Sequence, residues 1–134
     1  MANAKATTRP QGERNIRTYR AEGGALAHRL AAMQGTADDQ AKAVTGAGVA
    51  CVGVIAENSG AAAAGDLISV VQHGETVAIA GDVITPNVPV GVDANGKLVA
   101  VTGTDANIVG ISRSSAAADT DEFVVFVNLS PKRS

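Results

Sequence analysis

Short runs of valine and isoleucine, each closed by glycine, asparagine or aspartate, recur along this chain from residue 25 onward. Branched side chains favour extended backbone, and runs of about four to eight residues have the length of strands. The expected strands are Cys51–Ile55, Leu67–Val71, Thr76–Ala80, Lys97–Val101, Ile108–Ile111 and Phe123–Val127. We therefore predict an all-β fold, either a small β-barrel or a jelly-roll-like β-sandwich.

The clearest turn is predicted at Asp93-Ala94-Asn95-Gly96, which stands between two valine-rich runs. Asn-Gly readily adopts the positive φ angles that a tight hairpin needs. Pro86 and Pro89 lack an amide donor, so the stretch Thr85–Val90 is expected in a loop or at a sheet edge.

The segment from Leu26 to Met33 is ambiguous. Leu26, Leu30 and Met33 have helical spacing and the segment is rich in alanine, but it is short and glycine lies on both sides. Because the rest of the chain has strand character, we favour a strand here and keep a helix as the alternative.

A faint internal repeat runs through the chain. Each copy has a strand with a central glycine, an alanine-rich loop, an acidic residue and a second strand. The matching pieces are Val52-Gly53-Val54, Ala61–Ala63, Asp66 and Leu67–Val71 in one copy, and Val109-Gly110-Ile111, Ala116–Ala118, Glu122 and Phe123–Val127 in the other. The repeat predicts two related β units packed together, and coincidence in a chain rich in small residues is the alternative.

Residues 1–24 are expected to form an extended basic arm on a single β domain of residues 25–134. Ile16 and Tyr19 are the only sizeable apolar anchors of this arm, which therefore cannot fold alone. Residues 1–29 carry six basic and two acidic side chains, whereas residues 30–134 carry five basic and eleven acidic ones. A basic arm on an acidic body is the result.

Chemistry-bearing residues are sparse. The single cysteine, Cys51, lies in an apolar run, and His28 and His73 have no partner at a metal-binding spacing. The acidic clusters at Asp38-Asp39 and at residues 119–122 lack the spacing of a calcium loop, and we interpret them as solvated loops. We therefore expect no enzyme activity, no catalytic residues, no bound cofactor and no metal site.

The polar, basic start of the chain has no hydrophobic segment typical of a signal peptide, and no apolar run has transmembrane length. We expect no export and no membrane partner.

Three stretches resemble the capsid decoration, or cement, proteins of tailed bacteriophages. They are Thr18–Gly23, Ala80–Thr85 and Val90–Ala100, together with the repeated strand pattern. The resemblance covers residues 18–128 and departs from the family in the longer basic stretch at residues 1–17. It implies a β module on the outer surface of the virion, made in the host cytoplasm, that bridges major capsid protein subunits and stabilises the expanded head.

In this setting the arm is expected to lie on acidic capsid surface, since arginine pairs well with carboxylates. The contact residues expected are Arg9, Arg14, Arg17, Tyr19 and Arg20. Direct contact with packaged DNA is the weaker alternative, because Tyr19 is the only aromatic residue of the arm that could stack on bases. A tail without a partner is a third. A free-standing β-barrel that binds a ligand or a host surface is the alternative to the decoration function.

The two phenylalanines of the chain, Phe123 and Phe126, lie in the last predicted strand with opposite parity. One should therefore point into the core and the other outward. An outward phenylalanine among valines would form an oligomer or capsid patch, and a homo-oligomer is expected. The alternative is that both faces of this strand are buried within one copy.

Overall fold

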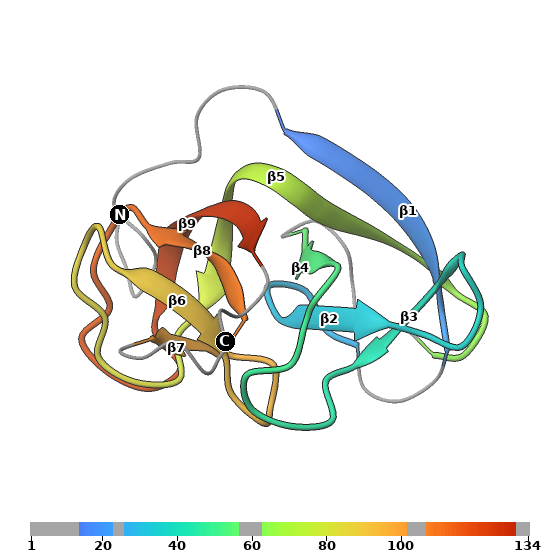
Figure 1. The fold of residues 1–134 in the computed structure, drawn as a ribbon, viewed down its shortest axis with the longest axis horizontal. Coiled ribbons are helices and arrows are strands. Elements are labelled where there is room, and N and C mark those ends of the chain that lie inside the picture. The colour runs from blue at the N-terminus through green and yellow to red at the C-terminus, as the bar shows by residue number, and fades with distance from the viewer. Residues whose placement is uncertain (1–13, 23–25, 57–62, 102–106, 131–134) are drawn as a thin grey trace.

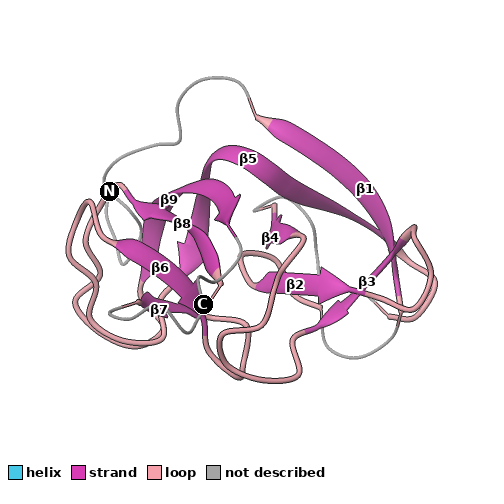
Figure 2. Cartoon of the chain, in the orientation of Figure 1, coloured by secondary structure: helices cyan, strands magenta, loops and turns pink. Residues whose placement is uncertain are grey.

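The computed structural model describes residues 14–22, 26–56, 63–101 and 107–130. These residues form nine β-strands and no helix (Figures 1 and 2). The strands are β1 (Asn15–Ala21), β2 (Ala31–Gln34), β3 (Gln40–Ala43), β4 (Gly53–Ile55), β5 (Leu67–Ile79), β6 (Pro89–Val92), β7 (Leu98–Ala100), β8 (Ile108–Ser112) and β9 (Glu122–Ser130). The predicted all-β class is confirmed.

The first five strands close a mixed barrel in the order β1-β3-β2-β4-β5, with β5 returning to β1. β1 and β3 are parallel, and the other neighbours are antiparallel. The barrel encloses one apolar cluster, which is made of Tyr19, Ala21, Leu26, Ala32, Ala41, Ile55, Ile68 and Val70. Of the two architectures predicted, the barrel is the one that forms.

β5 is 13 residues long and extends beyond this barrel. Its first half pairs with β1 and β4, and its second half pairs with β9 (Figure 1). Four further strands continue the sheet in the order β9-β8-β6-β7. An isolated parallel bridge between Ala80 and Leu98 brings β7 back to the end of β5. The second group of strands therefore also returns to the strand from which it starts.

The two groups of strands repeat one another in order, direction and register. We call β1–β4 with the first half of β5 the first unit, and the second half of β5 with β6–β9 the second unit. Four residue pairs of the first unit each have a counterpart in the second. Tyr19–Ile68 corresponds to Ala78–Phe123, Ala21–Ala41 to Ala80–Leu98, Ala32–Gly53 to Val90–Gly110, and Val54–Val71 to Ile111–Phe126. β5 thus serves as the last strand of one unit and the first of the next.

The connections between strands follow the same repeat. The amide of Ala21 donates to the carbonyl of Asp66 at 2.7 Å, and the amide of Ala80 donates to that of Asp121 at 2.8 Å. The Asp66 carboxylate accepts from the Ala63 amide at 3.0 Å, as the Asp121 carboxylate does from Ala117 at 3.1 Å. The predicted internal repeat is therefore present in the fold, but the partner of Asp66 is Asp121 and not the neighbouring Glu122.

The second apolar cluster is larger and reaches across both units. Its members from the second unit are Ala78, Ala80, Ile84, Val90, Val92, Leu98, Val109, Ala116, Phe123, Val125 and Val127. The first unit contributes Ala31, Val54, Ala56 and Val71, all of them buried. The outer side of the first barrel is therefore part of the core that joins the two units.

The runs Leu67–Val71 and Thr76–Ala80, predicted as two strands, are one strand. The polar stretch between them resembles a turn in sequence, but Gly74 adopts a φ of 113° and lets the strand continue. At this point His73 pairs with Asn15 of β1 and with Asn128 of β9. The first and last described strands therefore meet at the middle of β5.

The N-terminal boundary also differs from the prediction. Residues 15–21, predicted as part of the arm, form β1, which pairs with β3 and β5 inside the barrel. The segment from Leu26 to Met33 contains no helix: Ala31–Gln34 is strand β2, and a turn precedes it. The predicted hairpin forms between β6 and β7, with Gly96 at a φ of 86°.

Candidate interaction surfaces

The basic residues near β1 have different environments. Tyr19 is only 2% exposed, and its hydroxyl accepts a hydrogen bond from the Gln72 amide at 2.9 Å. Arg17 is exposed, and its guanidinium lies 4.9 Å from the centre of the Tyr19 ring. Arg14 donates to the Thr76 hydroxyl at 3.4 Å. Tyr19 therefore belongs to the core, and Arg17 covers it from the solvent side.

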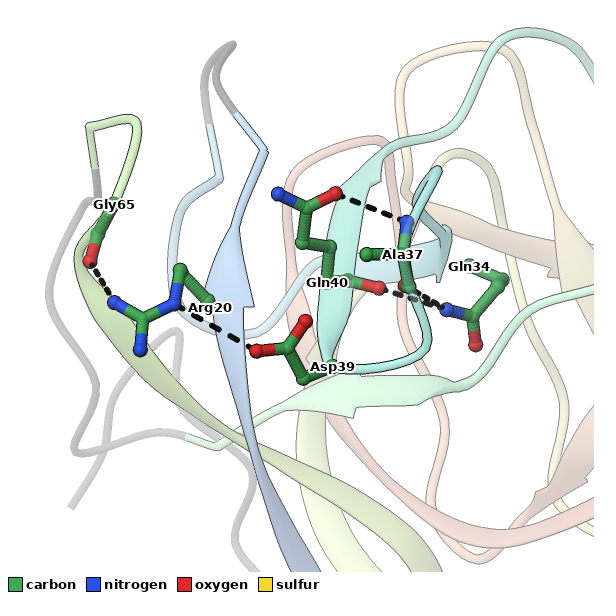
Figure 3. Close-up of polar contacts among 6 residues, drawn as sticks. All are labelled: Arg20, Gln34, Ala37, Asp39, Gln40 and Gly65. Atoms are coloured by element: carbon green, nitrogen blue, oxygen red, sulfur yellow. Dashed lines mark hydrogen bonds and ion pairs between the residues drawn. The ribbon is translucent and has the colours of Figure 1, made fainter.

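Arg20 is held by the body of the protein (Figure 3). Its guanidinium donates to the Gly65 carbonyl at 3.3 Å and lies 3.7 Å from the Asp39 carboxylate. The turn beside it is ordered by Gln34, whose amide donates to the Ala37 carbonyl at 2.7 Å. Of the predicted arm contacts, Arg14, Arg17, Tyr19 and Arg20 fall on or beside β1, whereas Arg9 lies outside the described residues.

The two phenylalanines lie on opposite faces of β9. Phe123 is fully buried in the second cluster, whereas Phe126 is half-buried on the outer face of the sheet. The Phe126 ring meets the His73 ring edge-on at 5.1 Å, and the Arg113 guanidinium lies 5.2 Å from its centre. Arg113 also pairs with Glu75 at 3.7 Å. Phe126 therefore forms a small aromatic and cationic patch with His73 and Arg113. Sequence parity had placed the two phenylalanines on opposite faces, and a partner for this patch stays a prediction.

Among the described residues, the groups that could perform chemistry do not gather into a metal-binding set. Burial raises the pKa of the Cys51 thiol to about 12, so the reactive thiolate is scarce at neutral pH. Within the described ranges, no three His, Cys, Asp or Glu side chains come close enough to hold a metal ion. The hydroxyl and amide of Thr36 donate to the Glu22 carboxylate and lower its pKa. These contacts order the loop and create no reaction centre.

One cavity lies between the first unit and the β6–β7 turn. Its volume is about 210 Å³, and of the side chains that line it only that of Asn95 is polar. The lining residues are Leu26, Leu30, Ala31, Ala43, Val44, Ala94, Asn95 and Gly96.

The part of the chain that the structure describes contains no helix long and apolar enough to cross a membrane.

The fold and its surfaces define a class: an all-β protein in which a closed five-stranded mixed barrel carries four further strands. No family model and no curated protein sequence matches the chain. Among solved structures, the N-terminal base of the head fibre protein gp8.5 of bacteriophage phi29 is similar. The TM-score is 0.64 at 15% sequence identity, over 91% of this chain and 100% of the other. This likeness shows a common fold.

Proposed function

We propose that this chain is a structural protein of a phage head, located on its outer surface. The observation that carries this proposal is the likeness to the phi29 head fibre base, which extends over nearly the whole of both chains. That base is by its description part of a head fibre, and the same position on the head is proposed for this chain. The protonated Cys51 and the absence, within the described residues, of a His, Cys, Asp and Glu cluster that could hold a metal support a structural function over an enzymatic one.

The finer proposal is a decoration function: each copy binds major capsid protein subunits across a seam and stabilises the expanded head. Ligand binding to the assembled state alone stabilises that state by mass action, and many copies acting together add to the effect. The core suits such a protein, since only 2% of the residues are aromatic and the buried side chains are mostly valine and alanine. A partner surface then supplies burial that the small core lacks.

The basic N-terminal segment is proposed to contact acidic capsid surface. Tyr19 is no longer a candidate because it is buried, and Arg20 is already engaged by Asp39 and Gly65. Arg17, which is exposed at the start of β1, and Arg9, which precedes it in the chain, are the remaining strong candidates. Bidentate pairing with carboxylates would make this contact sensitive to salt.

Recognition of a small ligand by a free-standing module is less well supported. Ligand pockets usually have volumes of roughly 300–1,000 Å³ and several convergent polar groups. The cavity beside Asn95 has a volume of about 210 Å³ and one polar side chain. Its size and lining favour packing between units over ligand binding.

Sedimentation of the labelled protein with DNA-free, expanded heads tests the proposal. The wild-type chain should bind in a saturable way and raise the temperature at which the heads come apart. The double substitution Arg9→Glu with Arg17→Glu should weaken binding at least tenfold and reduce its dependence on salt. Absence of saturable binding by the wild-type chain would refute the decoration function.

A matched control separates a specific contact from a change in net charge. Lys132→Glu with Arg133→Glu changes the charge by the same amount at the other end of the chain. This control should bind heads like the wild type. Equal weakening by both double substitutions would contradict a contact made by the N-terminal segment.

A further inference from the structure

The face of the first unit that packs on the second is formed by Ala31, Val54, Ala56 and Val71. We call it the covered face. All four residues are at most 2% exposed and belong to the apolar cluster shared by both units. The intrachain packing therefore shows what this surface of the unit is shaped to contact.

The repeat assigns a counterpart to each of these residues in the second unit. Ala31 of β2 pairs with Val54 of β4, and in the same way Pro89 of β6 pairs with Ile111 of β8. Val54 also pairs with Val71 of β5, as Ile111 pairs with Phe126 of β9. The amide of Ala56 donates to Ser69 as that of Arg113 donates to Val124. Pro89, Ile111, Arg113 and Phe126 therefore form the same face of the second unit, which we call the open face.

Among the described residues, none covers the open face as the second unit covers its counterpart. Ile111 is 38% exposed, although Val54 at the equivalent position is fully buried. Pro89 and Arg113 are exposed, and Phe126 is half-buried. An apolar face that is buried in one unit and open in the other lacks a partner.

The structure also indicates which surface would cover it. Ala31 of the covered face and Arg29 beside it contact the β6–β7 turn, Ile79 and Glu122. The Gly96 carbonyl accepts from the Ala31 amide at 2.8 Å, the Ile79 amide donates to the Arg29 carbonyl at 3.2 Å, and the Glu122 carboxylate lies 3.3 Å from the Arg29 guanidinium. Ile79 pairs with Glu122 as Arg20 pairs with Leu67. The counterpart surface on the first unit therefore contains Leu67, Arg20 and the β2–β3 turn, and we call it the Leu67 face. Figure 3 shows Arg20 beside this turn.

The Leu67 face is open as well. Leu67 is 65% exposed and is the most exposed of the large apolar side chains among the described residues. In the second unit its place is taken by Glu122, whose carboxylate lies 3.3 Å from the Arg29 guanidinium. Arg29 has Asn87 as its counterpart, and both have positive φ angles. The equivalent contact between two copies would thus replace an ion pair with Leu67 and a neutral amide.

We propose that the open face of one copy docks on the Leu67 face of a second copy, repeating between chains the packing of the two units within one chain. The contact is heterologous, so each copy offers both faces. Its large apolar side chains are Phe126, Ile111 and Leu67, whereas Arg113 and Arg20 are already paired with Glu75 and Asp39 within the chain. Pro89 has no amide hydrogen to repeat the bond that Ala31 donates to Gly96. Self-association should therefore vary little with salt, unlike the capsid contact proposed above for the arginines.

Sedimentation velocity of the purified chain, in the absence of heads, tests this proposal. The wild type should associate as its concentration rises through the micromolar range. Phe126→Glu and Leu67→Glu should each weaken association at least tenfold. A mixture of the two variants should restore a dimer, because each retains the face that the other lacks.

Folding and specificity are checked with Ile111→Lys, which should behave like Phe126→Glu, and with Val83→Glu, which should associate like the wild type. Val83 is 57% exposed and belongs to neither face. Melting temperatures of all variants would verify that they are folded. A wild type that stays monomeric, a Leu67→Glu variant that associates normally, or a mixture that fails to dimerise would overturn the proposal without bearing on head binding.

Discussion

Two glycines hold equivalent positions in the two units. A Cβ added to Gly53 in β4 would collide with the carbonyl oxygen of Val71, and one added to Gly110 in β8 would collide with that of Phe126. Both obstacles are backbone atoms of a paired strand, which cannot move aside as a flexible side chain can. Glycine is therefore required where β4 approaches β5 and where β8 approaches β9.

Gly53→Ala and Gly110→Ala should each lower the free energy of unfolding by about 1–3 kcal/mol, because the added methyl group forces the strands apart. Urea denaturation would measure the effect. Gly46→Ala is the matched control, since a Cβ there meets no atom within 4 Å, and it should change stability by less than about 0.5 kcal/mol. Full stability of Gly110→Ala would mean that the close approach is not needed.

Side-chain direction along a single strand could be predicted from sequence, whereas burial that depends on distant strands could not. The alternation in β9 places Phe123 and Phe126 on opposite faces whatever surrounds the strand, and the structure shows that Phe123 is the one that points inward. Tyr19, by contrast, lies in a polar and basic stretch that resembles a solvated arm. Its burial depends on pairing with Ile68 and a hydrogen bond from Gln72, both far along the chain.

At the scale of elements, the β6–β7 hairpin depends on one residue. Gly96 has a φ of 86°, and a Cβ there would lie 3.3 Å from the Ala31 carbonyl oxygen of the first unit. Gly96→Val should therefore destabilise the protein by about 1 kcal/mol or more, through backbone strain and through crowding of the contact between units. An unchanged melting temperature would contradict this assignment of the turn.

Most strands could be located from runs of branched residues, because local pattern and final structure agree there. β1 could not, because Asn15–Ala21 has only two large apolar residues and is ordered by pairing with β3 and β5. The continuity of β5 could not be predicted from the sequence either, since a polar stretch with a glycine fits a turn as well as a bent strand. In both cases the structure of the segment is determined by pairing with strands far along the chain and not by its local sequence.

For the whole molecule, the duplication is plain in register and faint in sequence. One reason is an exchange of volume between paired positions. The first unit pairs Tyr19 with Ile68, whereas the second pairs Ala78 with Phe123, so the large aromatic side chain lies on the opposite strand of the pair. Each unit buries its aromatic side chain, but neither position of the pair has the same residue in both units. Equivalent surface positions differ in the same way, since the apolar Leu67 of the first unit corresponds to the charged Glu122 of the second.

The meeting of β1 and β9 at the middle of β5 brings the two chain ends of the fold together. Asn15 and Asn128 both pair with His73, so adjacent-strand spacings place them within about 10 Å of one another. Residues 131–134 joined to residues 1–13 would be more than long enough to span this gap. A circular permutant that links Ser134 to Met1 should therefore be compatible with the fold.

Opening such a permutant between Asp82 and Val83, which are both exposed, leaves β5 whole. It should unfold in one cooperative transition with a melting temperature within about 5 °C of the linear chain. Opening it between His73 and Gly74 divides the strand that both units share, and this variant should not fold. Folding of the second permutant would show that the two units are separable. The segments that lead to either end of the linear chain join the described fold near the same point, beside His73 in the middle of β5.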